Sequence, residues 1–587
     1  MSRVSSLMSH VSRPQSLVFR LLPAVFGVLS LWAEPEFQSV PSCGYRWFET
    51  MMKTADGVEL YTYGVVPTNG VKCPVIVTRT PYDGHRLDKG ASKWAEGAGA
   101  SYGLRRGYAR VVQQCRGSSR STGVRVPYVD ERRDSLAALA FVRTLPCYNG
   151  EIFLEGGSYL SSVHWAYLDE CPSDVKGAVL NIQCADRYPV VMHNGFPKIG
   201  LHINWYAGQY KSNVDGFARH REVSPAEIPF CDFTKRFFGD GAEGPLAGLD
   251  DIISHPRPED PFWRTPGGAG GEYRRAFVDS KIPILMTTGW FDIYADAMCD
   301  QWREASPARR ANCALVIDAF DHGGKRSGEA TNRTSVVRFP GGSRHDAGVA
   351  VRSLDWFDYV RGLKPAPEQV EVGGVTWYAL WENAWHRAKD VPAGEKALTL
   401  VPQGAAERRY RYDPRRPAKF PVGCGLGFGN ISPMPKPDFR DDVVTYFFDS
   451  VAETIDVAGR MKVALAVKSD CDDTAFYVRV SVKKAGTDVF YGLRESIKAL
   501  TWDDGDYTPG TVRTLRFTLA DLAFRLGKGD VLRLDVSSSN AAMFAPHTNV
   551  KGLQAFIREP KVANNTVYAE GSSLILPTFR ENGQLEL

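Results

Sequence analysis

The sequence has few cysteines, and none of them is spaced for a metal or redox site. It contains 11 cysteines in 587 residues and no C-x-x-C pair. Zinc sites and thioredoxin-like redox sites use closely spaced cysteines, and small disulfide-stapled scaffolds need cysteine at much higher density. We therefore expect no metal, no other cofactor and no disulfide framework.

The sequence also lacks an excess of charge of either sign. It has 71 basic and 67 acidic side chains, a formal net charge of +4, and no basic stripe. Proteins that follow a phosphate backbone carry such a stripe, so nucleic acid is not an expected partner. Long hydrophobic runs are missing as well. No segment reaches the roughly 20 apolar residues that a membrane-spanning helix needs, so we expect no stable membrane span.

The first 33 residues differ from the rest of the chain. Arg3, Arg13 and Arg20 precede the apolar run 21–33 (LLPAVFGVLSLWA), and this segment contains no acidic residue. A basic region followed by a short apolar run is typical of a secretory signal peptide, which predicts a secreted or periplasmic protein. The alternative is a mis-assigned start codon before an apolar N-terminal arm, which would leave the protein cytoplasmic.

The chain beyond this segment divides into three patterns. Short apolar runs alternate with helical patterns up to about residue 185 and again after about 280, which is typical of a mostly parallel α/β sheet covered on both faces. The segment between is rich in aromatics, glycine and proline and reads as an inserted, largely helical cap. After the amphipathic stretch 351–363 the hydrophobic period becomes two, which predicts an antiparallel β-sandwich.

These patterns predict the elements and the domains. The expected core strands are 74–77, 109–112, 152–154, 282–287 and 314–317, with a helix at 134–145. The expected sandwich strands are 461–467, 475–482, 511–519 and 531–536. The predicted domains are an α/β core at 34–187 and 279–365, a cap at 188–278 and a sandwich at 366–587.

A Gly-Gly-Ser sequence occupies a position suited to a nucleophilic serine. Residues 152–162 read IFLEGGSYLSS, in which a short apolar run ends in Gly156, Gly157 and Ser158 and a helical pattern follows. A serine nucleophile stands on a strained turn between a strand and a helix, and small neighbours let the substrate approach. Leu160 replaces the last glycine of the generic G-x-S-x-G motif, so the motif is incomplete. Its placement makes Ser158 the candidate nucleophile.

Two later strands lead into an aspartate and a histidine. A serine nucleophile needs a base to take its proton and a carboxylate to orient that base, and in doubly wound hydrolases the order is serine, acid, histidine. The run 282–287 leads to Asp292 and the run 314–317 leads to His322. We therefore predict these two residues as acid and base. The alternatives are Asp296, Asp318, Asp321, His345, His386 and His547.

Acyl transfer also requires hydrogen-bond donors for the oxyanion that develops on the substrate. The backbone N–H of Tyr159, directly after the nucleophile, is one candidate. A second donor is expected from a loop after an early strand, and the run 74–78 leads to Tyr82. The Tyr82 phenol is therefore the second candidate.

Six short motifs in a fixed order resemble those of one enzyme family. They are T-P-Y-D at 80–83, R-G-x-x-x-S-x-G at 116–123, G-G-S-Y-L at 156–160, G-W-F-D at 289–292, D-H-G-G at 321–324 and L-D-W-F-D-Y at 354–359. With them the chain resembles the cocaine esterase and Xaa-Pro dipeptidyl-peptidase (CocE/NonD, S15-like) family of α/β-hydrolases, which includes the α-amino acid ester hydrolases. The resemblance implies an α/β-hydrolase core, a helical cap and a C-terminal jelly roll. It also implies the triad Ser158, Asp292 and His322, with Tyr82 and Tyr159 as oxyanion donors.

One departure from the family concerns the substrate. The amino ester hydrolases carry acidic residues that pair with the substrate ammonium, but the corresponding segments here read YPVVM at 188–192 and IYA at 293–295. An ammonium buried without a carboxylate is costly, so a free α-amino substrate is disfavoured. Asp186 and Asp296 lie near these segments and leave that inference open. The resemblance places a pocket tryptophan at Trp205, and Phe291 and Trp290 beside the acid are further pocket candidates.

The sequence therefore predicts a serine hydrolase that cleaves carboxylic ester or amide bonds of a small molecule through an acyl-enzyme. Xaa-Pro dipeptidyl-peptidase and α-amino acid ester hydrolase activities are alternatives. A non-catalytic carbohydrate-binding protein is an alternative from another class. A homo-oligomer is compatible with the sequence.

Overall fold

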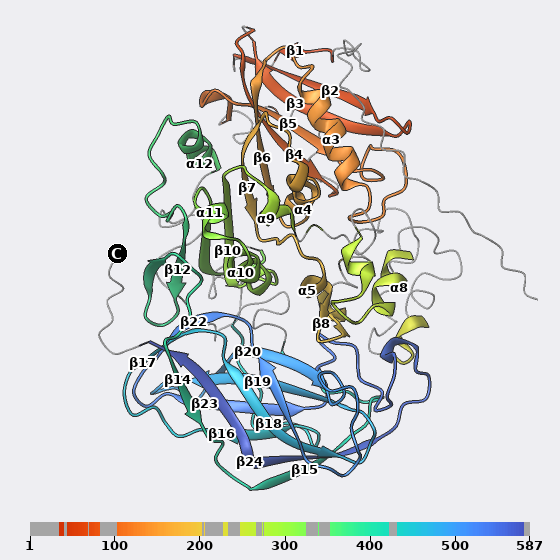
Figure 1. Ribbon diagram of the computed structural model, residues 1–587, viewed down its shortest axis with the longest axis vertical. Helices are drawn as coiled ribbons and strands as arrows, with labels where there is room; N and C mark the ends of the chain where they lie inside the picture. The colour runs from red at the N-terminus through yellow and green to blue at the C-terminus, as the bar shows by residue number, and fades with distance from the viewer. Residues whose placement is uncertain are drawn as a thin grey trace, which may run out of the picture.

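The computed structural model describes residues 35–39, 44–68, 70–82, 95, 103–201, 205, 227–232, 247–265, 273, 275–323, 339, 353–421 and 431–579. The predicted signal peptide lies outside these residues. Three parts follow one another along the long axis of the molecule: a large sheet with its helices, a cap beside its lower end, and a sandwich below (Figure 1). Among the described residues, no helix is long and apolar enough to cross a membrane.

An eleven-stranded sheet forms the α/β core. In spatial order its strands are β1 (Gln38–Ser39), β2 (Tyr45–Lys53), β3 (Glu59–Pro67), β5 (Ala109–Gln114), β4 (Cys73–Thr80), β6 (Tyr148–Gly157), β7 (Val175–Asn181), β10 (Ile284–Phe291), β11 (Ala314–Asp321), β12 (Gly374–Ala379) and β13 (Ala384–Ala388). The strands from β5 to β12 are parallel, and antiparallel pairs flank them at both edges. The predicted α/β class is confirmed.

Alternate residues of the central strands enter two hydrophobic clusters. Ile76 and Phe153 pack with residues of α12 (Ser353–Val360) on one face of the sheet. Val77 and Leu154 belong to the cluster on the other face, which includes residues of α3 (Glu131–Val142), α4 (Tyr159–Trp165) and α10 (Ala295–Glu304). A strand covered on both faces is apolar at successive positions, which is why the predicted core strands read as continuous apolar runs.

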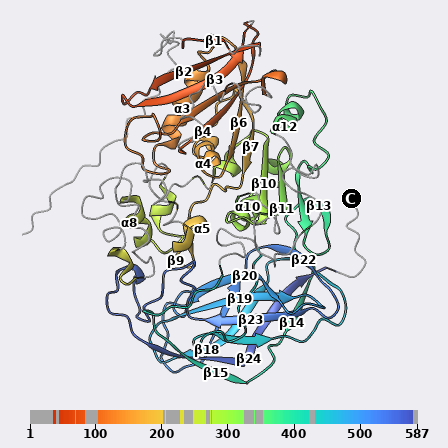
Figure 2. The same cartoon turned by 180° about the vertical axis from the view of Figure 1, so that it is seen from behind.

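The cap is inserted between β7 and β10. Its described elements are α5 (Tyr188–Val191), β8 (Met192–His193), β9 (Phe196–Pro197), the 3₁₀ helix η4 (Phe230–Asp232), α8 (Ala247–Ser254), the 3₁₀ helix η5 (Pro261–Arg264) and α9 (Arg275–Asp279). These short helices agree with the prediction, and a small antiparallel hairpin of β8 and β9 adds to it. Seen from behind, the cap elements lie between the core and the top of the sandwich (Figure 2).

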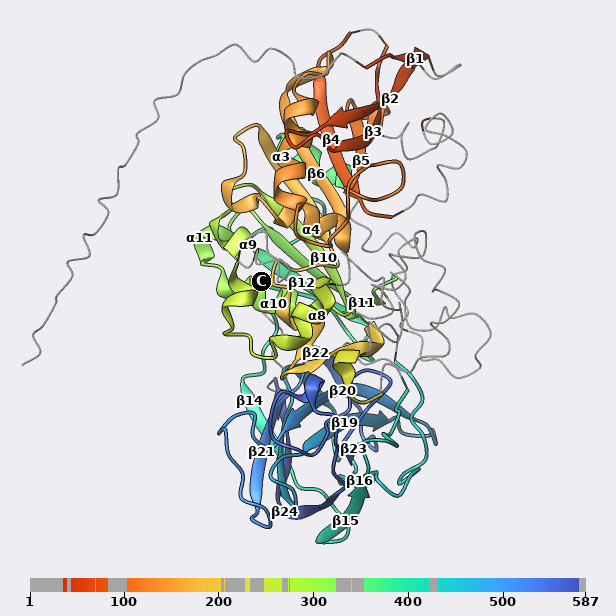
Figure 3. The same ribbon diagram turned by 90° about the vertical axis from the view of Figure 1, so that its right-hand side faces the viewer.

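The C-terminal part is a sandwich of two antiparallel sheets. The larger sheet contains β14 (Lys396–Leu400), β15 (Glu407–Tyr412), β17 (Ile455–Gly459), β18 (Lys462–Ser469), β21 (Arg513–Thr518), β22 (Leu522–Leu526) and β24 (Ala563–Thr578). The smaller sheet contains β16 (Val444–Phe447), β19 (Ala475–Lys483), β20 (Phe490–Ala499) and β23 (Val531–Ser537). In the side view, β14, β21 and β24 of the larger sheet lie on one side of the sandwich, and β19, β23 and β16 of the smaller sheet lie on the other (Figure 3).

The change from core to sandwich comes later in the chain than residue 366, the predicted boundary. β12 pairs in parallel with β11, and β13 pairs with β12, so residues 374–388 complete the hydrolase sheet. Just beyond β12, the N–H of Leu380 donates to the carbonyl of Ala523 at the start of β22. The apolar residues of β12 gave no sign of which sheet they join, because strand period alone does not identify the partner strand.

The smaller sheet buries polar side chains as well as apolar ones. The sequence of β19, AFYVRVSV, alternates as in a strand with one solvated face, yet Arg479 is 0% exposed. Its guanidinium lies 2.5 Å from the carboxylate of Glu495 on β20. The polar face of this sheet is therefore an interior surface whose charges are paired.

Candidate active site

The predicted functional residues meet at one edge of the core sheet. Ser158 follows β6, Asp292 follows β10 and His322 follows β11, while Tyr82 lies two residues beyond β4. Parallel strands all end at the same edge, and open α/β sheets bind ligands there. The strand order β4-β6-β7-β10-β11 therefore brings together residues that lie far apart in the sequence.

The serine stands on a strained turn. Ser158 has φ 56° and ψ −130°, a conformation that L-residues seldom adopt, and α4 begins at the next residue. A Cβ on Gly156 would lie 2.2 Å from the carbonyl oxygen of Leu160, whereas one on Gly157 would meet nothing closer than 3.6 Å. The first glycine of the motif is thus required by a backbone contact. The contact is with the backbone carbonyl of residue 160, which any amino acid carries. The turn therefore forms with Leu160 in place of the last glycine of G-x-S-x-G.

Ser158, His322 and Asp292 form a hydrogen-bonded chain. The Oγ of Ser158 lies 2.9 Å from Nε2 of His322, and Nδ1 of His322 lies 2.9 Å from Oδ1 of Asp292. Asp292 is 0% exposed, and its other oxygen accepts a hydrogen bond from the hydroxyl of Thr288 at 2.9 Å. The backbone N–H of Tyr294 donates to Oδ1 at 3.2 Å. These donors replace the water that the buried carboxylate has lost.

Tyr82 lies beside the serine. Burial raises the pKa of its phenol, while hydrogen bonds with the Trp205 indole and the Ser158 hydroxyl oppose the rise. The indole N–H of Trp205 donates to the Tyr82 oxygen at 3.4 Å. Tyr82 therefore keeps its proton at neutral pH and remains a hydrogen-bond donor.

A small cavity opens at the serine. The described residues that line it are Tyr128, Ser158, Tyr159, Leu201, Trp205, Ile293, Tyr294 and His322. The Trp205 ring stacks on Tyr159 with 5.6 Å between centroids, and the Tyr294 ring lies 5.4 Å from that of His322. Burial raises the pKa values of the phenols of Tyr128, Tyr159 and Tyr294. Aromatic rings therefore make up most of the described walls, Leu201 and Ile293 complete them, and the phenols are neutral.

A buried ion pair fixes the residue that follows the nucleophile. The hydroxyl of Tyr159 donates to Glu131 at 2.7 Å, and Glu131 also lies 2.7 Å from the guanidinium of Arg79. Arg79 is 0% exposed and also donates to Gln113 at 2.8 Å. This chain ties the start of α4 to α3 and β4.

Two buried guanidinium groups lie behind the cavity walls. The Arg125 carbon Cζ lies 5.3 Å from the ring centroid of Tyr159 and 5.7 Å from that of Trp205. The Cζ of Arg187 lies 3.6 Å from the ring centroid of Tyr128. Arg125 is 7% exposed and Arg187 is 4% exposed. The described walls therefore have two arginine cations packed against their rings.

The two acids left open by the sequence lie outside the described cavity lining. Asp296 accepts a hydrogen bond from Arg460 of the sandwich at 2.7 Å. Asp186 accepts one from the backbone N–H of Tyr188 at 3.0 Å. Neither carboxylate belongs to the residues that the structure describes around Ser158.

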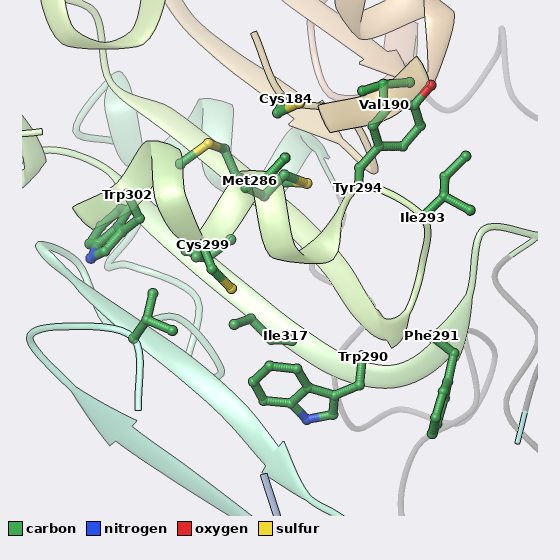
Figure 4. Packing of buried hydrophobic residues seen from close by; sticks show 14 of the residues in the cluster. Cys184, Val190, Met286, Trp290, Phe291, Ile293, Tyr294, Cys299, Trp302 and Ile317 are labelled. Atoms are coloured by element: carbon green, nitrogen blue, oxygen red, sulfur yellow. The ribbon is translucent and has the colours of Figure 1, made fainter. Parts of the chain in front are cut away.

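Trp290 and Phe291, predicted for the substrate pocket, are core residues. Both are 0% exposed and absent from the described lining of the cavity. The Trp290 indole N–H donates to the carbonyl of Tyr378 on β12 at 2.6 Å, and Phe291 stacks on Phe339. Figure 4 shows both side chains pointing away from Tyr294. They still belong to β10, and the chain turns toward the cavity only after them.

The other candidate histidines have different surroundings. His386 belongs to the edge strand β13, and its Nε2 lies 2.8 Å from the carboxylate of Glu382. His547 lines a second cavity of about 120 Å³ between the cap and the sandwich, with its Nε2 3.3 Å from Asp473. His345 lies outside the described residues. Within the described part of the chain, no group of three or more His, Cys, Asp or Glu side chains is placed to hold a metal ion.

Sequence reasoning missed several residues of the site. Ile293 and Tyr294 directly follow the predicted acid, so their position in the chain was a usable signal. Tyr128 enters the cavity from a loop and has φ 74°, and no pattern around it indicates a site residue. Glu131 accepts a hydrogen bond from Tyr159, and Thr288 donates one to Asp292. Both contacts arise only in the folded chain, so the sequence gives no signal for them.

Gly156→Ala is expected to abolish activity, because its Cβ would overlap the backbone of Leu160. Overpacking of this kind costs about 1–3 kcal/mol or moves the backbone of the turn. The matched control is Gly157→Ala, whose Cβ has room. Ester hydrolysis and thermal unfolding of both variants check this, and equal activity of the two would contradict it.

The chain matches two family models. The model described as X-Pro dipeptidyl-peptidase (S15 family) matches residues 56–324, and the model of the X-Pro dipeptidyl-peptidase C-terminal non-catalytic domain matches residues 365–573. Cocaine esterase of Rhodococcus sp. (strain MB1 Bresler) is 24% identical over 590 residues, covering 90% of this chain and 98% of the relative.

Solved structures share the whole architecture. An aminopeptidase from a marine sediment Thaumarchaeota archaeon has a TM-score of 0.74 at 17% identity, covering 94% of this chain and 99% of its own. An α-amino acid ester hydrolase has a TM-score of 0.73 at 20% identity, covering 95% and 100%. A CocE/NonD family hydrolase from Staphylococcus aureus has a TM-score of 0.63 at 14% identity, covering 91% and 94%. The core, cap and sandwich agree with these folds, and the chain belongs to the family of serine hydrolases that includes cocaine esterase and the X-Pro dipeptidyl-peptidases.

Proposed function

We propose that the protein is a serine esterase in which Ser158 attacks the carbonyl carbon of a carboxylic ester. The observation that carries the proposal is the hydrogen-bonded chain from Ser158 through His322 to Asp292. His322 accepts the serine proton during attack, and Asp292 orients the imidazole and stabilises the imidazolium that forms. His322 then returns the proton to the leaving alcohol. A water molecule, activated by the same imidazole, hydrolyses the acyl-enzyme and releases Ser158.

Two donors would stabilise the tetrahedral oxyanion. The phenol of Tyr82 stays protonated and adjoins the serine hydroxyl. The backbone N–H of Tyr159 belongs to the first residue of α4, so the hydrogen-bond ladder of that helix does not use it. Donors that are already oriented lower the barrier because they need no reorganisation as charge develops.

We infer a substrate whose acyl part carries no free ammonium. The described cavity lining contains no aspartate or glutamate, and the guanidinium groups of Arg125 and Arg187 lie behind its aromatic walls. A buried ammonium without a carboxylate partner is costly. This favours simple esters over X-Pro dipeptides and α-amino esters, and the name of the Rhodococcus relative also supports an ester substrate. The predicted leader would place this activity outside the cytoplasm, and export stays a prediction of the sequence.

Ser158→Ala is expected to lower kcat for a p-nitrophenyl ester by at least about a thousandfold, because the nucleophile is lost. Ser162→Ala is the control, since Ser162 is a buried serine in the same helix. Wild type and the control should also be labelled by a fluorophosphonate at Ser158. Full activity of Ser158→Ala would contradict the proposal, and an unlabelled wild type would favour the non-catalytic carbohydrate-binding alternative.

Tyr82→Phe is expected to lower kcat about a hundredfold with little change in KM, because one oxyanion donor is lost. The raised pKa of the Tyr82 phenol means that it loses its proton only above its ordinary value of about 10. The ratio of wild-type to variant kcat should therefore be constant between about pH 6 and 9. A ratio that approaches one at the alkaline end would show that Tyr82 ionises there and is not held as a donor.

Methyl phenylacetate is expected to be hydrolysed with a kcat/KM at least about tenfold above that of methyl phenylglycinate near pH 6, where the amine is charged. The two esters differ only in the α-ammonium. Raising the pH until the amine is deprotonated should reduce the difference in kcat/KM between the two esters. Preference for the charged ester, or faster cleavage of an X-Pro anilide than of either ester, would support the alternative activities instead.

A further inference from the structure

The turn that carries Asp292 begins at an irregular point of the sheet. The pairing of β10 with β11 passes from Gly289 and Asp318 to Phe291 and Asp321, so two residues of β11 lie opposite Trp290. Irregularities of this kind change the direction of a strand and are frequent beside active sites. Trp290 is 0% exposed, and its buried carbonyl needs a donor.

That donor comes from the sandwich. Nη2 of Arg494, on β20, donates to the carbonyl of Trp290 at 2.8 Å. The same nitrogen donates to the carbonyl of Asp521 at 2.6 Å, while Nη1 donates to the carbonyl of Leu493 at 2.9 Å. Arg494 is 1% exposed. Carbonyls of the sandwich thus fix the guanidinium, which holds the chain two residues before Asp292.

A second arginine of the sandwich holds the chain beyond Asp292. Arg460, between β17 and β18, donates to Asp296 and to Asp300 of α10, each at 2.7 Å. Its Nε also donates to Asp521 at 3.0 Å, and the Asp521 N–H donates to Asp296 at 3.2 Å. Figures 1 and 2 both show α10 above β20, at the top of the sandwich. Asp521 therefore links the two arginines.

We propose that Arg494 and Arg460 are positioning residues for Asp292, and this inference rests on the proposed catalytic role of the triad. The described donors to the Asp292 carboxylate come from Thr288, Tyr294 and His322 of the core. The sandwich therefore holds the same turn at Trp290 and at Asp296, on either side of the acid. Because displacement of a catalytic group by about 1 Å can lower the rate about a hundredfold, these contacts control the rate of the chemical step.

The test compares four full-length variants with the wild type. Arg494→Gln is expected to lower kcat for a p-nitrophenyl ester about tenfold to a hundredfold, with KM changed less than about twofold, because the substrate walls are untouched. Arg494→Lys should restore most of the loss, since one ammonium near the position of Nη2 can serve both carbonyls. Arg460→Gln keeps the buried Arg494 and should lower kcat in the same way.

The matched control is Arg533→Gln. Arg533 is also a buried arginine of the sandwich, and it donates to Asp535 and to the carbonyl of Pro435 within the sandwich. Its replacement should lower the unfolding temperature but leave kcat of the folded protein within about twofold. Near-UV circular dichroism at the assay temperature measures the folded fraction by which each kcat is divided.

The outcomes separate this inference from the proposed function. Unchanged kcat in Arg460→Gln and Arg494→Gln, or equal losses in these variants and in Arg533→Gln, would overturn the positioning role while the wild type remains an active esterase. If Arg494→Gln does not fold, Arg460→Gln and Arg494→Lys decide the question. A wild type that neither cleaves esters nor reacts with a fluorophosphonate would instead overturn the proposed function.

Discussion

The carboxylate of Asp292 has no exposed surface, and the arrangement of the site depends on supplying it with hydrogen-bond donors. A charge in the protein interior is stable only where donors replace its lost water. The donors are the imidazole of His322, the hydroxyl of Thr288 and the N–H of Tyr294. They lie in β10, directly after β11 and directly before α10, so the position of this one group requires β10, β11 and α10 to have a fixed relation.

The sandwich contributes to that relation, although the matching family model describes its domain as non-catalytic. Two of its arginines donate to the core: Arg494 to the carbonyl of Trp290, and Arg460 to Asp296 and Asp300. Buried charged groups are costly unless geometry pairs them well, so such a surface specifies one mode of docking. The two parts therefore fit in one relative position.

The sequence predicted much of the core and the site because the signals were local. The runs before Ser158, Asp292 and His322 are apolar, and each of these polar residues directly follows the strand that contains its run. Strand order in the sheet then brings the three together. Tyr82 was predicted for the same reason, as a residue just after β4.

The failures have a shared cause, which is that hydrophobic period does not reveal partners. Trp290 and Phe291 adjoin the acid in sequence, but they are still strand residues and pack in the core. Arg479 lies in an alternating strand pattern, which is typical of one solvated face, yet the segment around Phe420 and Pro421 of the same sandwich covers it. Tyr128 and Glu131 join the site through tertiary contacts alone.

The last two strands of the hydrolase sheet come late in the chain, and this limits where parts of this protein can be exchanged with parts of a relative. β12 and β13 lie within the segment matched by the C-terminal family model, yet they extend the hydrolase sheet, because β12 pairs with β11 and β13 pairs with β12. Directly after β12, Leu380 bonds to β22 through its N–H and its carbonyl. A chimaera joined at the boundary of the sequence models would give the hydrolase sheet two foreign edge strands. One joined after β13 would keep that sheet intact but would still have to match the backbone of the new sandwich at Leu380. Exchange between relatives is therefore limited by this backbone contact in addition to the arginine contacts with Trp290 and Asp296.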